Sequence, residues 1–456
     1  MRLQSGPDIE LPSLAVECEV CEDWEMEDDG AFVFRLRQDV VWQDLSPVNG
    51  RPLTVGDIVF SYNRQRQPDR PNAALLGAVE GLEAPDPNTL RISLSVPDAD
   101  FMLSLAHGHT KIVAPEAVAF NGDLRDGPTV GSGPWILRET GPDAIHAFDR
   151  NPTYFEEGRP LVDELLIHII PDPTIRNAAF RVGSIDIAQM DESQWEQYLQ
   201  RRPSAPFLLV PDTTGVEIGL NVRAAAFEDV RVRRAVFQAT DPWNTIDHVW
   251  HGKAYLSPVF PVASADWLLP EDELRAYFAD PAGARELLRE ARVSLPVPVA
   301  IKVGDFGDVY QAHAERIADE MRRVGFEPEI EVVNRRAFGD EVWLRGDYQM
   351  FIGPPAPSAT PNGYLLPVLH SQGQLNNSGV DDRELDALIE EQAQEFDPAA
   401  RTELVLAIQR KMLDNAYRFM PAARLSVWTW SDRVQDFYPN FAAFEYSHWS
   451  RVWLRN

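Results

Sequence analysis

Two cysteines spaced as Cys-x-x-Cys are the residues whose type and spacing most directly suggest chemistry. They are Cys18 and Cys21, in VECEVCEDW, and the chain has no other cysteine. A structural zinc site needs about four ligands, and no second Cys-x-x-Cys or His-x-x-x-His follows. A redox site would open a helix, whereas the flanking segments SLAVECEV and GAFVFRLR look like strands. Three states stay open: reduced thiols at a strand end, which we expect first, a local disulfide, or metal or redox chemistry.

The nine histidines are scattered, and two pairs have a spacing that metal sites use. His107 and His109 form His-x-His, and His248 and His251 are three residues apart on a possible helix. Neither pair has a carboxylate or a third histidine in the pattern of a known metal site. Ser132 lies in VGSGPW, which is neither a phosphate-binding loop nor a nucleophile elbow. We therefore expect no catalytic residue, no metal and no cofactor, and we predict that the chain is not an enzyme.

The charge balance argues against one class of function. The chain has 71 acidic and 42 basic side chains and a formal net charge of −29 at pH 7. Nucleic-acid binding requires a basic surface for phosphate contacts, and most of this surface would repel DNA or RNA. The aromatic residues, 22 Phe, 12 Trp and 11 Tyr, are a better indication, because large aromatic side chains line clefts that bind organic ligands.

One basic stretch departs from the acidic balance. It is FEDVRVRRAVFQAT, at residues 227–240, whose apolar residues recur at helical spacing. Arg231 and Arg234 share the face opposite the apolar stripe, and Arg233 lies at its flank. Asp229 is a predicted N-cap that can reach Arg233 four residues on. We expect these arginines to form a solvated, partly ion-paired helix face.

The length of 456 residues predicts two to four domains. No run approaches the roughly 20 apolar residues of a membrane helix, and residues 1–12 lack the apolar core of an export signal. The clearest strand–helix–strand signal covers residues 296–333, and further helices are predicted at residues 383–396 and 398–415. The proline-rich segment GPPAPSATPNG, residues 353–363, is predicted to be a long loop.

Six segments in a fixed order carry a resemblance to a known family. They are LPSLAVECEVCEDWEMEDDGAFVFRLRQDVVWQD, LTVGDIVFSYNRQ, VGSGPWIL, RNPTYFEEGRPLVDELLIHIIPDPTIRNAAFRVGSIDIA, LNVRAAAFEDVRVRRAVFQATDPWNTIDHVWHGKA and DPAARTELVLAIQ. Each segment alone is modest, but the ordered set covers nearly the whole chain. It resembles family 5 of the extracellular solute-binding proteins, the peptide/nickel class that serves ABC importers.

The resemblance implies an α/β fold of the two-lobed, periplasmic-binding-protein-like type (type II, cluster C-like), with an extra N-terminal subdomain. Transferred to this chain, residues 1–130 form the extra subdomain of lobe I. Residues 131–220 form the core of lobe I, completed by residues 424–456. Residues 221–423 form lobe II.

The resemblance also implies a binding function, in which a peptide or another organic solute is held in a cleft between the lobes and delivered to the permease subunits of an ABC importer. It implies a monomer and a periplasmic or extracellular location, with no nucleic-acid partner. Alternatives are a redox enzyme on the same fold that uses Cys18 and Cys21, or a sensory receptor. The ligand-binding residues implied by the resemblance are Trp135, Asn221, Ala356, Pro357, Ser358, Asn362, Trp428 and Trp430.

One departure bears on the ligand. Peptide-binding members usually carry an aspartate that pairs with the α-ammonium group of the peptide, and Pro357 stands at that place here. A buried ammonium group without a counter-charge is costly. We therefore expect that the solute is not a dipeptide recognised through a free N-terminus, and a blocked or longer peptide, an oligosaccharide or another organic solute remains open.

Overall fold

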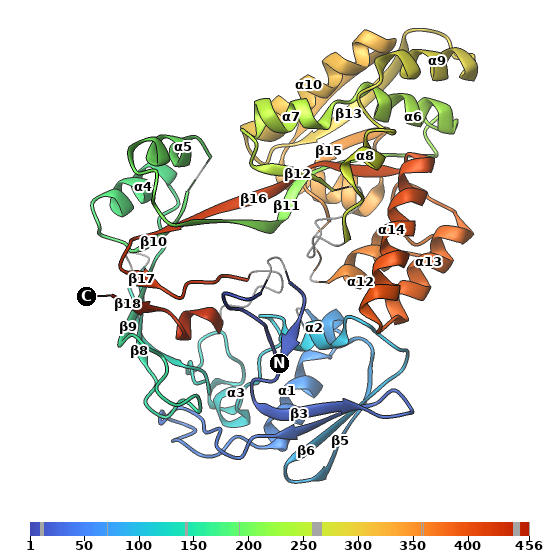
Figure 1. The fold of residues 1–456 in the computed structure, drawn as a ribbon. Coiled ribbons are helices and arrows are strands. Elements are labelled where there is room, and N and C mark those ends of the chain that lie inside the picture. The colour runs from blue at the N-terminus through green and yellow to red at the C-terminus, as the bar shows by residue number, and fades with distance from the viewer. Residues whose placement is uncertain are drawn as a thin grey trace. The chain divides into compact units, whose positions relative to one another are not determined.

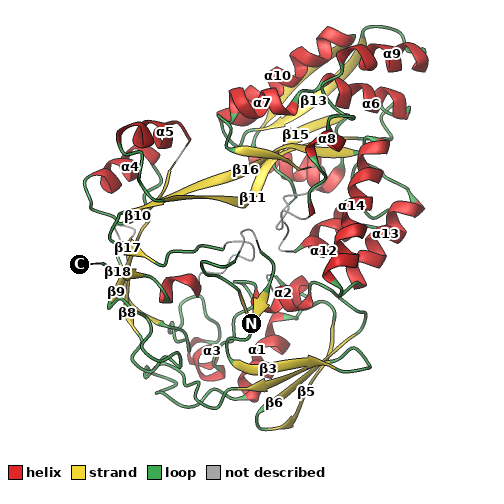
Figure 2. Ribbon diagram, in the orientation of Figure 1, coloured by secondary structure: helices red, strands yellow, loops and turns green. Residues whose placement is uncertain are grey.

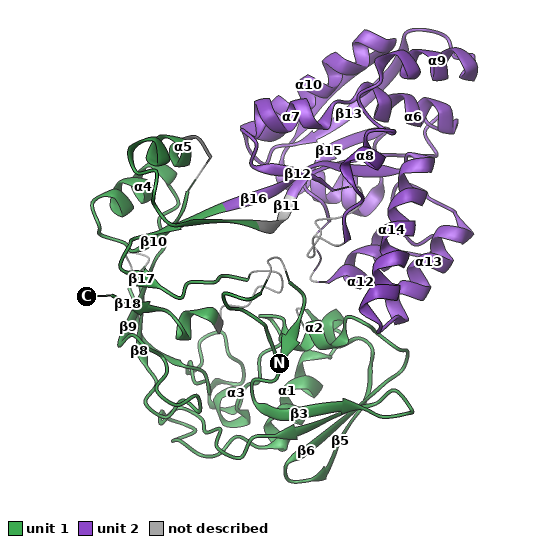
Figure 3. Cartoon of the chain, in the orientation of Figure 1, with its two compact units in different colours: residues 1–210, 427–456 green, residues 211–426 purple. Residues whose placement is uncertain are grey.

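The chain folds into two compact units (Figure 3), which we call unit 1 and unit 2. Unit 1 comprises Met1–Val210 and Val427–Asn456, and unit 2 comprises Pro211–Ser426. The computed structural model describes residues 1–9, 13–70, 72–141, 145–190, 192–257, 267–356, 358, 360–440 and 447–455. Both units mix helices and strands (Figure 2), which confirms the predicted α/β class.

Two neighbouring strands carry the chain between the units. The chain enters unit 2 within β11 (Phe207–Leu220) and returns to unit 1 within β16 (Arg418–Trp430). Each strand therefore contributes residues to both units (Figure 3). The finer division, with residues 1–130 as an extra subdomain, residues 131–220 and 424–456 as lobe I and residues 221–423 as lobe II, stays a prediction.

The first part of unit 1 is built on a four-stranded antiparallel sheet in the order β3-β4-β6-β5. Alternation in β4 places Phe32, Phe34 and Leu36 in the core, as the period of two predicts. The elements of this part are β1 (Arg2–Leu3), β2 (Val16–Glu17), β3 (Cys21–Met26), β4 (Phe32–Leu36), α1 (Val55–Gln65), η1 (Ala73–Leu76), β5 (Val79–Asp86), β6 (Thr89–Leu94), α2 (Phe101–Ala106) and α3 (Pro115–Asn121).

Cys18 and Cys21 form a disulfide, with their Cα atoms 5.1 Å apart. The expectation of reduced thiols was therefore wrong, and the second of the three alternatives is the correct one. The reason is local, because the chain bends between β2 and β3 and so brings the two Cα atoms into the range that a disulfide spans.

Reduction of this disulfide is expected to have a small effect. The loop that it closes is short, and chain-entropy arguments give about 2 kcal/mol for a loop of this size. We expect a thermal melt in a phosphine reductant to lose no more than about 2 kcal/mol of stability. Thiol titration of the denatured chain, with and without the reductant, checks that the bond was present and was then broken. A loss of the whole fold would show that the disulfide is a main support of the sheet.

The rest of unit 1 contains a three-stranded antiparallel sheet in the order β7-β8-β9. Two helices flank a short strand, β10, that pairs with the last residues of β16. The elements are β7 (Trp135–Thr140), β8 (Ile145–Arg150), β9 (Glu164–His168), α4 (Pro173–Arg181), β10 (Ile187–Met190), α5 (Glu192–Arg201), β17 (Val434–Gln435), η5 (Ser447–Ser450) and β18 (Trp453–Leu454).

Unit 2 holds most of the largest sheet, whose order is β10-β16-β11-β15-β13-β14. Helices lie on both faces of its β13–β15 part (Figure 1). The elements of unit 2 are α6 (Val230–Ala239), α7 (Pro242–Val249), β12 (Ala254–Ser257), α8 (Glu271–Leu274), α9 (Pro281–Ala291), β13 (Val297–Gly304), α10 (Asp308–Val324), β14 (Phe326–Val333), α11 (Arg335–Phe338), η3 (Gly339–Arg345), β15 (Met350–Gly353), α12 (Pro361–Tyr364), η4 (Leu365–Leu369), α13 (Arg383–Gln394) and α14 (Pro398–Asn415).

The predicted strand–helix–strand unit at residues 296–333 is confirmed. β13 and β14 are parallel neighbours, and α10 connects them. Ala314, Ile317 and Met321, which recur at helical spacing on one face of α10, are fully buried, and Gly325 ends the helix with a positive φ of 120°. The helices predicted at residues 383–396 and 398–415 are α13 and α14.

The arginine-rich stretch forms the predicted helix, α6, but two details were wrong: the ion-pair partner of Asp229 and the solvation of Arg233. Asp229 caps the helix by accepting from the Arg231 N–H (2.9 Å), but its ion pair is with the Arg231 guanidinium (2.5 Å) and not with Arg233. Arg233 is buried, and its Nε donates to the carbonyl of Asn415 (3.0 Å) at the end of α14. A cation at a helix C-terminus satisfies carbonyls that have no partner within the helix. This arginine therefore joins two helices instead of facing solvent.

Candidate ligand-binding site

Three of the predicted binding residues lie on one loop and helix of unit 2. The loop follows β15, where Ala356 is buried and Ser358 is half-buried, and it ends at α12, whose N-cap Thr360 accepts from the Gly363 N–H. The amide of Asn362 holds this segment to α13. Its Nδ2 donates to the carbonyl of Ala393 (3.2 Å), and its Oδ1 accepts from another α13 side chain, Gln392 (2.8 Å). Pro357, the fourth predicted residue of the loop, lies outside the described residues.

Asn221 lies at the other end of the same strand pair. In the β11–β15 ladder, Leu220 is opposite Met350 and Glu217 is opposite Gly353, so Asn221 and the loop leave the ladder from opposite ends. The Asn221 Nδ2 donates to the carbonyl of Tyr348 (3.0 Å). Its side chain therefore fixes the turn before β15, and the structure does not bring it together with the loop.

The two predicted tryptophans of β16 lie together in unit 1. Trp428 and Trp430 are two residues apart on a strand and pack on Phe437, with ring centroids 6.1 and 5.2 Å away. Trp430 also lines a pocket of about 410 Å³. The other residues that line it are Ser204, Pro206, Asp432, Val434, Gln435, Asp436, Phe437, Tyr438 and Arg455. An aromatic wall with carboxylates beside it suits an organic ligand that carries hydrogen-bond donors.

Trp135 begins β7 in unit 1 and is half-buried. Its main-chain carbonyl accepts from the Gln43 Nε2 (2.7 Å), and Gln43 Oε1 accepts from the Gly131 N–H (3.1 Å). This glutamine thereby fixes the glycine-rich turn that leads into the strand. The Trp135 indole N–H is buried and has no hydrogen-bond partner among the described residues. Such a donor is costly unless a water or a ligand accepts from it.

An ion pair that we did not predict lies in the core of unit 2. The Arg418 Nη1 is 3.1 Å from the Glu217 Oε1, and the two residues are 2% and 1% exposed. The Tyr364 hydroxyl donates to the same carboxylate, and the Arg418 Nη2 donates to the Ser378 hydroxyl (2.6 Å). Glu217 is on β11, Arg418 on β16 and Tyr364 on α12, so the network joins both strands that pass between the units to the helix after the loop.

The electrostatics of this network follow from its burial. Desolvation raises the pKa of the Glu217 carboxyl, and the charge of Arg418 opposes that rise. Desolvation also raises the pKa of the Tyr364 hydroxyl, so this group stays protonated and can donate. Because both charges are almost completely buried, they support the strands and α12 and do not offer a reactive group to a solute. An acidic residue within the otherwise apolar run GVEIGL was the available signal in the sequence.

The described ranges contain no group of three or more His, Cys, Asp or Glu side chains arranged to hold a metal ion. No helix within them is both long enough and apolar enough to cross a membrane.

Comparison with known proteins identifies the family. The family model described as bacterial extracellular solute-binding proteins, family 5 middle, matches residues 15–376. Heme-binding protein A of Haemophilus influenzae is 29% identical over 301 residues, which is 61% of this chain and 54% of that protein. The dipeptide-binding protein of Escherichia coli is 25% identical over 350 residues, or 70% of this chain and 63% of that protein. The matched part thus spans little more than half the length of these curated relatives.

Solved structures establish the fold. HbpA2 from Haemophilus parasuis has a TM-score of 0.82 at 23% identity, covering 100% of this chain and 94% of that one. NikA from Brucella suis in complex with Fe(III)-EDTA has a TM-score of 0.80 at 21% identity, covering 96% and 91%. The predicted two-lobed, periplasmic-binding-protein-like fold is therefore confirmed. With a family model that matches most of its length, the chain belongs to family 5 of the bacterial extracellular solute-binding proteins.

Proposed function

We propose that this protein is the substrate-binding component of an ABC-type importer, which binds a peptide or another organic solute reversibly and delivers it to a membrane permease. The observation that carries the proposal is the family match over residues 15–376. The fold supports it, because the chain forms two compact units that are joined by two strands. A ligand that binds the closed state of such a protein more tightly than the open state shifts the protein toward the closed state. Which residues of the two units hold the solute stays a prediction.

The solute is an organic molecule that is not recognised through the free α-ammonium group of a peptide. Relatives are named for heme, dipeptides and nickel, so family membership alone leaves the ligand open. The loop at residues 354–363 contains no acidic residue. An ammonium group bound there would have no counter-charge from the loop, and its desolvation would be uncompensated.

The partners and the location follow from the same proposal. A permease would recognise the ligand-bound protein, and a separate ATPase would drive transport. The protein would act as a monomer outside the cytoplasm, where disulfides form and persist. The Cys18–Cys21 disulfide and the extracellular designation of the family support that location.

A thermal-shift screen tests the proposal. Peptides with free N-termini, N-acetylated peptides, oligosaccharides and metal chelates would be added in separate wells at high concentration. A ligand present at about 100 times its Kd adds about 2.7 kcal/mol of stability, so a true solute shifts the melting temperature by several degrees. We expect a shift from one organic class, with the ligand recovered unchanged. Conversion of the ligand to a product would contradict a binding function.

Matched variants then test the predicted site. Trp430→Ala is expected to reduce the ligand-induced shift, because Trp430 lines a pocket in unit 1. Trp24→Ala is the control, since Trp24 is 41% exposed on β3 and outside the predicted binding residues. Equal ligand-induced thermal shifts in the two variants would show that Trp430 does not bind the solute. A strong shift by peptides with free N-termini, lost on acetylation, would contradict the argument from the loop.

A further inference from the structure

The pocket of about 410 Å³ in unit 1, which we call the Trp430 pocket, is bounded by three segments that lie far apart in the sequence. They are the end of β16 with the turn after it, the stretch before β11, and the residue after β18. Main-chain hydrogen bonds hold these segments together. The Trp430 N–H donates to the carbonyl of Pro206 (3.4 Å), and the Arg455 N–H donates to the carbonyl of Arg433 (2.7 Å). The volume lies within the range of about 300–1,000 Å³ that small-molecule sites occupy.

Two half-buried aromatic residues, Trp430 and Tyr438, line this pocket. Phe437 is 2% exposed and supports the Trp430 ring, with the two ring centroids 5.2 Å apart and an interplanar angle of 74°. Among the described residues, no arginine side chain lies over the Trp430 or Tyr438 ring. The uncovered ring surface is therefore available to a cationic group of a ligand, which the π-electrons of Trp and Tyr attract.

Two carboxylates line the same pocket, those of Asp432 and Asp436. The Trp453 indole N–H donates to the Asp436 Oδ2 (2.9 Å), which leaves the Oδ1 without a donor in the described part of the chain. Asp432 pairs with Arg202 at 3.3 Å, but both side chains are more than half exposed, so this ion pair is weak. Each carboxylate therefore keeps the capacity to accept hydrogen bonds from a ligand.

The other polar groups of the lining also favour a ligand that donates hydrogen bonds. Arg455 is a basic residue of the lining, and its Nη2 donates to the main-chain carbonyl of Asp432 (3.0 Å). The Gln435 Nε2 donates to the carbonyls of Asp432 (3.0 Å) and Val434 (2.9 Å), which leaves its Oε1 to accept from a ligand. Two carboxylates against one guanidinium give the lining an excess of negative charge. An occupant with one positive charge would balance it.

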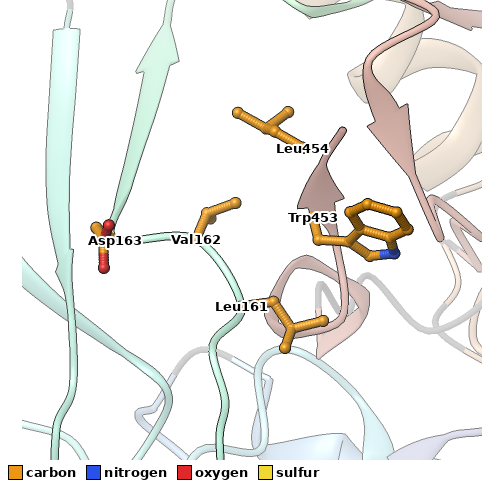
Figure 4. Close-up of a pocket in the computed structure, with 5 residues that line it drawn as sticks. All are labelled: Leu161, Val162, Asp163, Trp453 and Leu454. Carbon is orange, nitrogen blue, oxygen red and sulfur yellow. The ribbon is translucent and has the colours of Figure 1, made fainter. Parts of the chain in front are cut away.

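A second pocket of unit 1 provides a comparison. It has a volume of about 560 Å³ and is lined by Leu161, Val162, Asp163, Trp453 and Leu454 (Figure 4). This lining is mainly aliphatic, and the side chain of its one acidic residue, Asp163, is 91% exposed and pairs with Arg150 (3.2 Å). The Trp430 pocket is smaller, and it combines aromatic rings with two carboxylates. The chemistry of the lining therefore favours a cation in the Trp430 pocket and not in the larger one.

We propose that the Trp430 pocket binds an alkylguanidinium group of the solute, stacked on the Trp430 ring and paired with the carboxylates of Asp432 and Asp436. A guanidinium group is planar, is more weakly hydrated than an ammonium group and donates in pairs to carboxylates, so it suits an aromatic surface with acids beside it. The inference rests on the proposed function and deepens it, because it makes the solute a guanidinium-bearing organic molecule. It agrees with a loop at residues 354–363 that contains no acidic residue, since the charge that is recognised is not an α-ammonium group.

Three small probes test the recognised charge. Nα-acetylarginine methylamide and Nα-acetylcitrulline methylamide have the same shape and blocked ends, but only the arginine probe is charged. In calorimetric titrations of the full chain at low ionic strength, the arginine probe is expected to bind at least about tenfold more tightly than the citrulline probe. Nα-acetyllysine methylamide is expected to bind more weakly than the arginine probe, because its ammonium group is compact and strongly hydrated. An arginine probe that binds no better than either of the other two overturns the proposal.

Matched aspartate variants locate the binding. Asp436→Asn removes one charge but keeps an acceptor for Trp453, and asparagine tolerates the φ of 56° at this position. It is expected to weaken the arginine probe at least about fivefold and to leave the citrulline probe unchanged. Asp163→Asn removes the same charge from the other pocket and is expected to change neither affinity. An arginine affinity that is unchanged in Asp436→Asn overturns the proposal. So does an equal loss in both variants, since the net charge of −29 would then attract the probe without a site.

Two results distinguish a failure of the guanidinium site from a failure of the proposed function. A solute without a guanidinium group that raises the melting temperature reversibly in the thermal-shift screen supports the binding function and overturns the guanidinium site. In the converse result, no organic solute raises the melting temperature, but the arginine probe keeps its preference and loses it in Asp436→Asn. That result contradicts the proposed function and supports the assignment of the pocket.

Discussion

Arg418→Met is expected to lower the free energy of unfolding of unit 2 by about 3–5 kcal/mol, the usual cost of removing one partner of a buried ion pair. Glu217 is 1% exposed and would keep a buried charge with no cation beside it. The Tyr364 hydroxyl would remain its hydrogen-bond donor, but one neutral donor does not replace a guanidinium group. The free energy would be measured by chemical denaturation, with hydrogen exchange of β11 and β15 amides to assign the loss to unit 2.

Two further variants separate the ion pair from general damage. Glu217→Leu combined with Arg418→Met replaces both charges by apolar groups, and the double variant is expected to recover most of the loss. Arg231→Met is the surface control. The Arg231 side chain is 44% exposed and pairs with Asp229 in solvent, so its loss is expected to leave the free energy of unfolding almost unchanged. Additive losses in the double variant would show that the two charges do not stabilise each other.

The same variants bear on function. The network connects β11, β16 and α12, and α12 ends the loop that carries Ala356, Ser358 and Asn362. If that loop binds the solute, Arg418→Met should reduce the ligand-induced thermal shift by more than its loss of stability explains. The prediction depends on the position of α12, because the buried charges themselves do not reach the solute.

The elements predicted best from the sequence are those with local periodic signals. The parallel strand–helix–strand at residues 296–333 and the helices α13 and α14 were predictable because each buries a stripe of residues a few positions apart. The Glu217–Arg418 pair joins residues 201 positions apart, and no local pattern specifies such a contact. The contact made by Arg233 was not predictable for the same reason, since the carbonyl that it binds lies 182 positions away in the sequence.

The candidate site shows the same limit. Trp428 and Trp430 are both among the predicted binding residues, and their spacing on a strand places both on Phe437. Asn221 and Asn362 were predicted binding residues from the family resemblance, yet both amides bind neighbouring segments of unit 2. A sequence alone does not distinguish a polar side chain that binds a ligand from one that binds a main-chain carbonyl. The resemblance to the family supplied the fold, and it could not supply these contacts.

Acidification is expected to destabilise unit 2 through His313 on α10. The ring is completely buried, and desolvation, with the charge of Arg316, lowers the pKa of His313 to about 3. The Trp250 indole N–H donates to its Nδ1 (3.3 Å), which requires a neutral ring. Because the native pKa lies below the ordinary value of 6.5, stability is present above pH 6.5 and is lost as the pH falls toward 3. Between pH 7 and pH 5 this loss is about 2 kcal/mol.

Glu320, on the same helix, makes stability depend on pH in the opposite direction, so the test must isolate the histidine. Burial raises the pKa of Glu320 to about 7, and stability from that group is present below pH 4.5 and is lost as the pH rises through 7. From pH 7 to pH 5 the loss from His313 and the gain from Glu320 are each about 2 kcal/mol, so the two nearly cancel in the native protein. His313→Asn keeps an acceptor for Trp250 but cannot be protonated, so the stability difference between the native protein and this variant should shrink by about 2 kcal/mol from pH 7 to pH 5. His251→Asn is the control, because His251 is exposed and has a positive φ of 49° that asparagine tolerates. A difference that stays constant with pH would mean that His313 binds its proton equally well in the folded and unfolded chain, and the burial argument would fail.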